Sequence, residues 1–468
     1  MTFDTAVVGG TIVMPNRTAN ADIGITNGQI AALANPGSID DASKIIDASD
    51  NYVFPGLVDP HTHIDGYYSI DSYATATAAA ALGGVTSLIN FAWQAWEQDG
   101  PDSMSIWDKD GTLLEGVRRQ KRKGSESLID FGLHGGLTRE DPSVFDELDD
   151  VVEEGVNSFK LFTAYEQRLS NGFIDRVFKR LSDLDGIAVV HTEDQSVIDA
   201  RIAELKTAGK TDPESYPESR PPIVEAMTAD SILRLATDRD VQYYGFHTSG
   251  GSVGDVIAEY QTDGTQVRGE TCPHYLALTE EAYAEQGTLP IIAPPLRSAE
   301  EREGLIKHLE DGTLSAISTD HVAFKRSKKE VENWWDSAFG ANSLQNSLPV
   351  AHDVLVNERG MSYPALIRLL CTNPAKTFGF SEKGTLDVGT DADIVVFDPD
   401  KEQTITADSN ASKADYSIYE GRTVTGSVET VLVRGTVVAA DGDIVADPGY
   451  GEFVHREPVS WEPLAQGG

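Results

Sequence analysis

Short apolar runs alternate with helical patterns through the middle of the chain. Amphipathic or alanine-rich stretches such as DSYATATAAAALGG, FIDRVFKRLSDL and EAMTADSILRLATD separate runs that fit buried strands. The predicted strands cover 54–59, 86–92, 128–134, 158–163, 187–191, 241–247, 267–272 and 314–319. Eight strands that alternate with helices predict an α/β fold, the parallel (β/α)8 TIM barrel.

Both ends of the chain have a different pattern. DTAVVGG, TIVMPN, ADIGITNG and QIAALA are short β-rich segments closed by turn residues, and DADIVVFDP, VETVLVRG, TVVAADG and DIVADPG resemble them near the C-terminus. We expect the two sets to form one small β-sandwich, although separate β appendages fit the same pattern. The predicted division is 1–52 for the N-terminal part of the sandwich, 53–380 for the barrel, and 381–468 for the C-terminal part and tail.

The charge balance limits the partners. The chain has 468 residues, with 37 Lys and Arg against 75 Asp and Glu, for a net charge of −38. This excess of negative charge argues against nucleic acid or an anionic membrane as a partner. The acids are spread along the chain and Asp outnumbers Glu, 43 to 32. Because salt screens self-repulsion, we expect a salt-rich cytoplasm, with an ordinary acidic bacterial enzyme as the alternative.

The two cysteines, Cys272 and Cys371, cannot form a disulfide framework, so a reducing compartment is expected. The first residues show no signal-peptide pattern, and no apolar run reaches the length of a membrane helix. These features predict a soluble, cytoplasmic protein.

Side chains that bind metals fall at the ends of the predicted strands. His61 and His63 end the first strand, and their i, i+2 spacing on a strand puts both imidazoles on one face. His191, His247 and Asp320 end the fifth, sixth and eighth strands. A single histidine at a strand end is more often a core or surface residue, so the combination carries the argument. The carboxyl ends of barrel strands form the active face, where these side chains should converge.

Lys160 lies inside the apolar run NSFKLFTAY. A lysine in such a run usually extends to the surface, but burial and neighbouring cations would favour its neutral amine. A neutral amine can add CO₂ to give an anionic carbamate that bridges two metal ions. Nitrogen and oxygen ligands with open positions favour Zn²⁺, and Mn²⁺ or Co²⁺ would also fit. Two such cations that share a water would supply hydroxide near neutral pH.

With these residues in place, the chain resembles the cyclic amidohydrolases, most closely their hydantoinase/dihydropyrimidinase branch. The resemblance covers nearly the full length and rests on FPGLVDPHTHID, NSFKLFTAY, VVHTEDQSVI, YYGFHTSGGS, GETCPHYLALT, APPLRS, ISTDHVAF, NPAKTFGF and KGTLDVGTDADIVVFDP. It implies a TIM barrel with a small β-sandwich, two zinc ions, a carboxylated lysine and a homotetramer, with a dimer as the alternative. The ligand roles that it implies fall on His61, His63, Lys160, His191, His247 and Asp320.

The resemblance also implies hydrolysis of a cyclic amide, in which a metal-bridging hydroxide attacks the ring carbonyl. Asp320 would take the proton of the hydroxide and pass it to the leaving nitrogen. Tyr165 occupies the tyrosine position of the hydantoinase motif and would donate to the developing oxyanion, although a core or rim aromatic is the alternative. Backbone groups near Ala293, in the PPLR turn, would contact the substrate ring.

The substrate is less constrained. Dihydroorotases usually carry Arg two residues after HxH, where this chain has Asp65, so a carboxylate on the ring is disfavoured. Allantoinase remains the alternative, and a non-catalytic scaffold relative is disfavoured because all six ligand positions are filled. Aromatic residues near the mouth suit an apolar 5-substituent on a hydantoin, unless they form a lid or a subunit contact; they are Tyr67, Tyr68, Trp93, Trp96 and Phe162.

Three other histidines have structural interpretations. His134 and His274 are expected to be buried core residues with satisfied hydrogen bonds. His321 follows Asp320 and should point to the opposite face of the strand.

Overall fold

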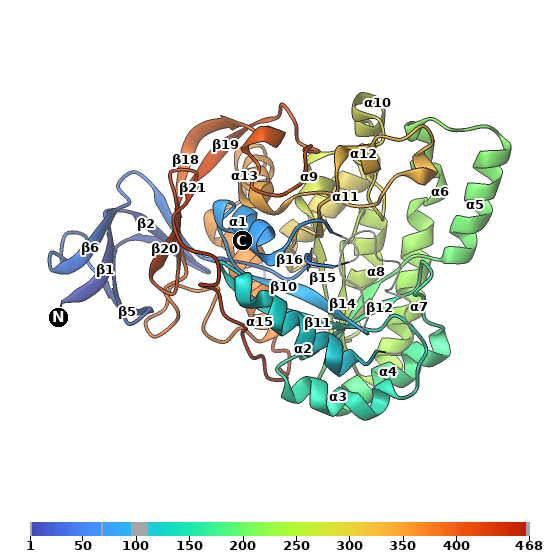
Figure 1. Cartoon of the computed structure of the whole chain (residues 1–468), viewed down its shortest axis with the longest axis horizontal. Helices are drawn as coiled ribbons and strands as arrows, with labels where there is room; N and C mark the ends of the chain where they lie inside the picture. Colours follow the sequence, from blue (N-terminus) through green and yellow to red (C-terminus); the bar gives the residue numbers. More distant parts are fainter. Residues whose placement is uncertain (1, 67–68, 95–110, 465–468) are drawn as a thin grey trace.

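A parallel sheet forms the centre of the computed structural model, which describes residues 2–66, 69–94 and 111–464 (Figure 1). Its order in the described chain is β16-β15-β14-β13-β12-β11-β10-β8, and every neighbouring pair is parallel. The strands are β8 (Leu57–Asp59), β10 (Val85–Trp93), β11 (Asp130–Gly136), β12 (Ser158–Phe162), β13 (Ile187–His191), β14 (Gln242–Gly245), β15 (Val267–Thr271) and β16 (Ala316–Ile317). The predicted TIM barrel is confirmed.

The barrel closes beyond the ends of its first and last strands. There β9 (Thr62–His63) pairs in parallel with β17 (His321–Val322). Below that pair the Thr319 hydroxyl donates to the buried Asp59 carboxylate at 2.6 Å. This closure brings the segment with the two N-terminal histidines beside the segment that carries Asp320.

Helices cover the outside of the barrel, as the alternation of the sequence predicts. Several begin at a serine, threonine or aspartate whose side chain accepts from the first turn, for example Thr112, Ser170, Asp194 and Ser298. The helices are α1 (Tyr73–Leu82), α2 (Leu113–Lys123), α3 (Val144–Glu153), α4 (Asn171–Asp183), α5 (Gln195–Thr207), α6 (Tyr216–Ser219), α7 (Pro222–Arg239), α8 (Gly251–Thr262), α9 (Pro273–Ala277), α10 (Ala282–Gln286), α11 (Ala299–Glu310), α12 (Arg326–Lys329), α13 (Ser347–His352), α14 (Tyr363–Ile367) and α15 (Asn373–Phe378). None of the described helices is long and apolar enough to cross a membrane.

The two ends of the chain form a β-sandwich beside the barrel (Figure 1). One sheet has the order β5-β4-β1-β6, and the other, β21-β20-β19-β18-β7-β2-β3, joins strands from both termini. Their shared core includes Ile12, Ile25, Ile394 and Leu432. The strands are β1 (Phe3–Val8), β2 (Thr11–Met14), β3 (Arg17–Asn20), β4 (Asp22–Thr26), β5 (Gln29–Ala34), β6 (Ala42–Asp47), β7 (Tyr52–Pro55), β18 (Ile394–Thr404), β19 (Thr423–Val433), β20 (Thr436–Ala440) and β21 (Asp443–Ile444). The boundaries at 52/53 and 380/381 stay a prediction.

The predicted strand 54–59 is wrong in one respect, because the chain changes sheet at Gly56. Before it, β7 pairs antiparallel with β18 in the sandwich, and after it β8 pairs with β10 in the barrel. A Cβ at Gly56 would lie 2.0 Å from the Thr86 hydroxyl, so only glycine lets the chain pass between the two sheets. Sequence periodicity does not detect this change, since both halves are equally apolar.

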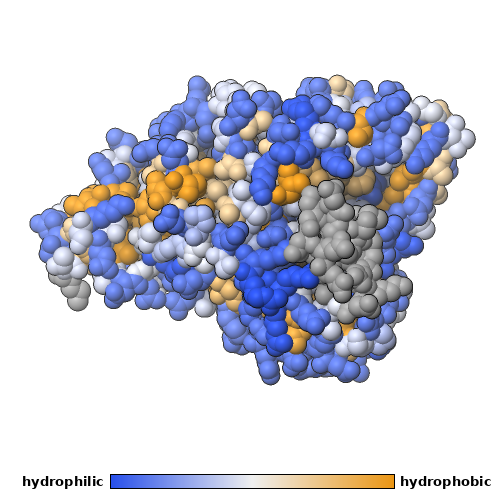
Figure 2. Space-filling view, in the orientation of Figure 1, coloured by the Kyte–Doolittle hydropathy of each residue, from blue (hydrophilic) through white to orange (hydrophobic). Residues whose placement is uncertain are grey.

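The C-terminal segment, residues 452–456, closes the amino-terminal end of the barrel. Phe131 on β11 exchanges backbone hydrogen bonds with this segment, and the fully buried Arg456 donates to the Leu133 carbonyl. Beside them Lys383 binds the carboxylates of Asp130, Asp391 and Asp393 at 2.7 to 3.0 Å. We call this end the floor and the opposite end the mouth. Figure 2 shows hydrophilic residues over most of the visible face, with a hydrophobic band over the sandwich.

Candidate metal centre

Asp320 lies between the two histidines of the first strand. Its Oδ1 is 3.0 Å from His61 Nε2 and 3.2 Å from His63 Nε2. One ligand atom from each of these three residues lies within 4.8 Å of the others. Burial opposes ionisation of Asp320, but the neighbouring His61 and His63 hold its pKa well below the ordinary value. We call this group the first metal position.

His191 and His247 form a second pair on adjacent strands. His191 Nδ1 and His247 Nε2 are 2.8 Å apart, and both rings are buried. Burial lowers the pKa of each imidazole, so both are neutral at pH 7 and able to bind a cation. The His61 and His247 ring centroids are 5.4 Å apart, which places this second metal position beside the first.

Lys160, on β12, lines the same cavity as the histidines. Its amine is 4.1 Å from the centroid of the Phe246 ring and 4.9 Å from that of Phe162, and the residue is 1% exposed. No ion pair to this amine occurs among the described residues. Burial lowers its pKa to about 7, against the opposing effect of Asp320 and Glu270 nearby.

A cavity of about 1010 Å³ opens above these groups, and all six predicted ligand residues line it. Tyr165, Phe162 and Ala293 line it as well. Trp93 is not among the lining residues; it is buried and its ring lies parallel to that of His63, with 6.1 Å between centroids. Tyr67, Tyr68 and Trp96 lie outside the described residues.

Three residues of the cavity have a left-handed backbone. The φ angles are 68° for Tyr165, 39° for His247 and 45° for Asp320. Such conformations cost roughly 1–3 kcal/mol each and persist where surrounding contacts impose them. Their concentration at one cavity fits a site in which side-chain direction takes precedence over backbone preference.

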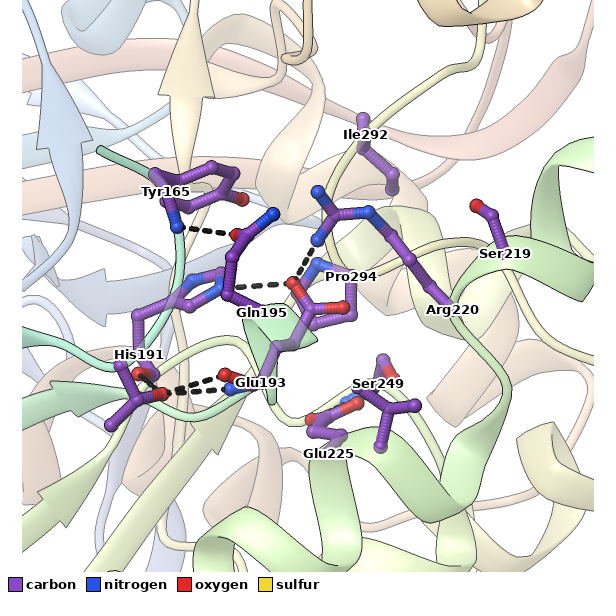
Figure 3. A network of polar contacts seen from close by, with 12 residues as sticks. Tyr165, His191, Glu193, Gln195, Ser219, Arg220, Glu225, Ser249, Ile292 and Pro294 are labelled. Atoms are coloured by element: carbon purple, nitrogen blue, oxygen red, sulfur yellow. Dashed lines mark hydrogen bonds and ion pairs between the residues drawn. The ribbon is translucent and has the colours of Figure 1, made fainter. Parts of the chain in front are cut away.

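Sequence reasoning missed two buried carboxylates that bind the histidines. Glu270 on β15 accepts from His61 Nδ1 at 2.7 Å and from the Tyr244 hydroxyl at 3.0 Å. Glu193 accepts from His191 Nε2 at 2.9 Å (Figure 3). The available signals were the position of Glu270 near the end of a predicted strand and that of Glu193 two residues after His191. A carboxylate in this arrangement fixes which ring nitrogen faces the centre.

The environment of Asp65 weakens one argument about substrate. Asp65 forms an ion pair with Lys123 at 3.0 Å and is not among the cavity-lining residues. The charge of Asp65 is therefore partly compensated, and its carboxylate does not line the cavity. The arginine of dihydroorotases is absent at this position, although Arg168, Lys325 and Lys328 line other parts of the cavity.

The other histidines are only partly as expected. Both nitrogens of His134 are bonded, to the Ser158 hydroxyl and the Pro60 carbonyl. His321 binds Asp71 at 3.0 Å, away from the cavity. The expectation for His274 was wrong, since this buried ring has no hydrogen-bond partner at either nitrogen among the described residues.

The residues present fit divalent cations. Neutral imidazole nitrogens and an ionised carboxylate are common ligands of zinc and related metals. His191 Nδ1 and His247 Nε2 face each other at 2.8 Å, and the Lys160 amine has no ion pair among the described residues. These groups converge on one space, where cations and a bridging anion would satisfy the electrostatics.

Comparison with known proteins agrees with this geometry. Residues 52–438 match the model of the Amidohydrolase family. The chain is 34% identical to a D-hydantoinase of Streptomyces coelicolor, over 97% of this chain and 98% of that protein. It is 28% identical to a dihydropyrimidinase of Arabidopsis thaliana, over 97% and 86%. The crystal structure of dihydropyrimidinase from Brevibacillus agri NCHU1002 superposes with a TM-score of 0.92 at 30% identity, covering 98% of this chain and all of that one.

Proposed function

The chain belongs to the Amidohydrolase family, and we propose that it is a metal-dependent hydrolase that opens the cyclic amide bond of a hydantoin or a dihydropyrimidine. The observation that carries this proposal is the convergence of four histidines, Asp320 and Lys160 on one cavity. The names of its relatives, D-hydantoinase and dihydropyrimidinase, support the substrate class. Allantoin is the alternative substrate.

Two divalent cations, with zinc favoured by the donor set, would fit the centre. His61, His63 and Asp320 would hold the first, and His191 and His247 would hold the second. When bound, they lower the pKa of water enough to provide a nucleophile at neutral pH and polarise the substrate carbonyl. The protein contributes the ligand geometry and a cavity that holds the ring.

Lys160, as a carbamate, would supply the anion that two neighbouring cations need. Because burial lowers the amine pKa to about 7, about half of the amine is neutral at pH 7. The neutral nitrogen forms an N–C bond to CO₂ and releases one proton, which leaves an anionic carbamate. The change converts an uncompensated buried cation into the anion that the two cations require.

Asp320 and Tyr165 perform the remaining proton and charge tasks. Asp320 is ionised at neutral pH, so its carboxylate accepts a proton from the nucleophile and returns it to the leaving ring nitrogen. Burial raises the pKa of Tyr165 well above its ordinary value, so its hydroxyl stays protonated. It can then donate a hydrogen bond to the carbonyl oxygen as negative charge develops there.

The aromatic and aliphatic lining favours an apolar ring substituent. Phe162, Phe324 and Phe339 line the cavity together with Ile70 and Val322. Burying an aryl or alkyl group against them would stabilise binding by removing apolar area from water. We therefore place 5-aryl and 5-alkyl hydantoins ahead of ring substituents with a carboxylate.

The assembly and the cellular setting are further parts of the proposal. A homotetramer fits the hydantoinase resemblance, with a dimer as the alternative. The dispersed excess of acids, with a net charge of −38, suits a salt-rich cytoplasm in which ions screen repulsion between subunits. Full activity and unchanged assembly after dialysis into dilute buffer would contradict the high-salt requirement.

A substrate panel tests the function. The metal-loaded protein in high salt is assayed with dihydrouracil, 5-phenylhydantoin, a 5-alkylhydantoin and allantoin, and ring opening is followed by loss of ultraviolet absorbance and by product chromatography. We expect turnover of a hydantoin or dihydrouracil and none by the Asp320→Asn control. Turnover of allantoin alone would move the assignment to allantoinase. A metal-loaded protein without activity on any ring would favour the scaffold alternative.

A further inference from the structure

Glu193 and Arg220 form a buried ion pair that is hydrogen-bonded to His191. Glu193, two residues after β13, and Arg220, just after α6, are 0% and 3% exposed. Arg220 Nη1 donates to Glu193 Oε2, the same oxygen that accepts from His191 Nε2 (Figure 3). Burying such a pair costs desolvation free energy, which is offset only by good geometry and further hydrogen bonds. The sequence motifs did not single this pair out.

The pair also contacts Tyr165. The Arg220 guanidinium carbon is 5.4 Å from the centroid of the Tyr165 ring, and that ring is 5.0 Å from the ring of His191. Gln195 accepts from the Tyr165 backbone N–H at 2.7 Å (Figure 3). Arg220 therefore lies beside Tyr165 and is linked to His191 through Glu193.

The hydrogen bond to Glu193 determines which nitrogen of His191 is available. An ionised carboxylate can only accept, so Nε2 of the ring carries the hydrogen. Arg220 Nη1 donates to the same carboxylate, and an arginine partner favours its ionised form. Nδ1 then has the lone pair, and Nδ1 is the atom that faces His247 Nε2 at 2.8 Å.

We propose that Glu193 and Arg220 are positioning residues that direct His191 Nδ1 into the second metal position and hold Tyr165 beside it. The inference rests on the proposed two-metal function and goes beyond it by assigning the second position its own support. The first position has a different one, because Glu270 binds His61. Loss of the Glu193 pair should therefore weaken one metal position and leave the other.

The same network provides a matched control. Arg297 donates to the Arg220 carbonyl and to Glu225, and Glu225 accepts from the Ser249 hydroxyl. Glu225 is 2% exposed and ion-paired with an arginine, as Glu193 is, but its polar contacts within the described ranges are to Ser249 and Arg297 and not to a histidine. A role limited to stabilising this part of the fold would make the two glutamates equivalent.

Metal retention separates the two interpretations. Wild type, Glu193→Gln and Glu225→Gln are loaded with Zn²⁺, dialysed against graded concentrations of a chelator, and analysed for metal per chain. We expect two zinc ions in wild type and in Glu225→Gln. Glu193→Gln should lose one of them at a roughly 10–100-fold lower chelator concentration and keep the other. Equal retention in all three proteins would overturn the inference, whereas a wild type without bound zinc would overturn the proposed function instead.

A paired substitution guards against misfolding. Arg220→Met alone leaves the Glu193 charge buried without its partner, which is strongly destabilising. The double variant Glu193→Gln/Arg220→Met removes both charges, and its circular dichroism and thermal unfolding show whether it folds. We expect a folded protein that also loses one zinc early. Tight retention of two zinc ions by the folded double variant would contradict the positioning role.

Discussion

The two ends of the barrel bury a lysine in opposite ways. At the mouth, Lys160 is surrounded by aromatic rings and its pKa falls to about 7. At the floor, burial also opposes the charge of Lys383, but Asp393, Asp130 and Asp391 outweigh it and raise the pKa. The floor completes its electrostatics with the chain's own residues, whereas the mouth leaves an amine and histidine nitrogens for groups from outside.

This difference separates stability from function. A cation held by three carboxylates is a permanent part of the fold, and it joins the start of β11 to the sandwich. The easily deprotonated Lys160 amine and the left-handed backbone of Tyr165, His247 and Asp320 do not by themselves increase the free energy of unfolding. We therefore expect substitutions at the mouth to remove activity and substitutions at the floor to remove stability.

Lys160→Ala should have the largest effect on activity. Without the bridging anion, the two cations would repel each other and lose a shared ligand. Metal content should therefore fall well below two per chain, and turnover should fall below detection. Partial recovery with acetate or propionate is expected, since a small carboxylate can occupy the vacated space. Metal analysis together with the hydantoin assay measures both effects. An unchanged content of two metals would disprove the bridge.

Tyr165→Phe should lower kcat by roughly 100- to 1000-fold, the usual cost of losing one oxyanion donor. The hydroxyl donates mainly as charge develops, so KM should change much less than kcat. Metal content serves as the control and should stay at two per chain. A fall in kcat of less than threefold would return Tyr165 to the role of a rim aromatic.

The pH dependence of metal uptake should follow the Lys160 amine. Its neutral fraction increases roughly from one tenth at pH 6 to nine tenths at pH 8, because its pKa is about 7. Reconstitution of metal-free protein with zinc at a fixed concentration of dissolved CO₂ should accelerate nearly tenfold over this range. His63, with its pKa lowered to about 4 by burial, stays neutral throughout. Burial opposes the charge of His61, but Asp320 and Glu270 raise its pKa, so a parallel series without CO₂ measures the contribution of His61. A rate independent of pH would contradict carbamate formation.

Lys383→Met should leave the activity per folded molecule almost unchanged and reduce stability. The substitution leaves Asp130 and Asp393 buried without their lysine partner, and breaking such a pair costs about 3–5 kcal/mol. Denaturant unfolding followed by fluorescence measures this loss, with Lys401→Met as an exposed ion-pair control that should cost less than about 1 kcal/mol. Equal stability of the two variants would remove the contrast between mouth and floor.

Local patterns were sufficient to predict the barrel and to bring the six ligand-type residues together. Parallel strands place their carboxyl ends at one edge, so His191, His247 and Asp320 could be assigned to one mouth before any distance was known. The observed strands differ mainly in length; β16 spans only Ala316–Ile317 within the predicted 314–319. The chain changes sheet at Gly56, where it approaches Thr86 closely. Sequence periodicity cannot detect such a tertiary contact.

The supporting residues could not be predicted in the same way. Glu193 follows a strand-end histidine by two residues, but its partner Arg220 is 27 positions away, so the ion pair appears only in the tertiary structure. Glu270 and His61 are separated by 209 positions. His274 looked like an ordinary core histidine, and only its surroundings reveal the missing hydrogen bonds. Strand-end position predicts which side chains meet, while the groups that orient them depend on tertiary contacts.

Carbon-13 NMR tests the central claim most directly. Metal-free protein is reconstituted with zinc and ¹³C-labelled bicarbonate, and wild type is compared with Lys160→Ala. The account predicts one carbamate resonance per wild-type chain, lost on metal removal at low pH and absent from the variant. A fully active, two-metal wild-type protein without that resonance would contradict the account, because the anion between the two cations would then have to come from elsewhere.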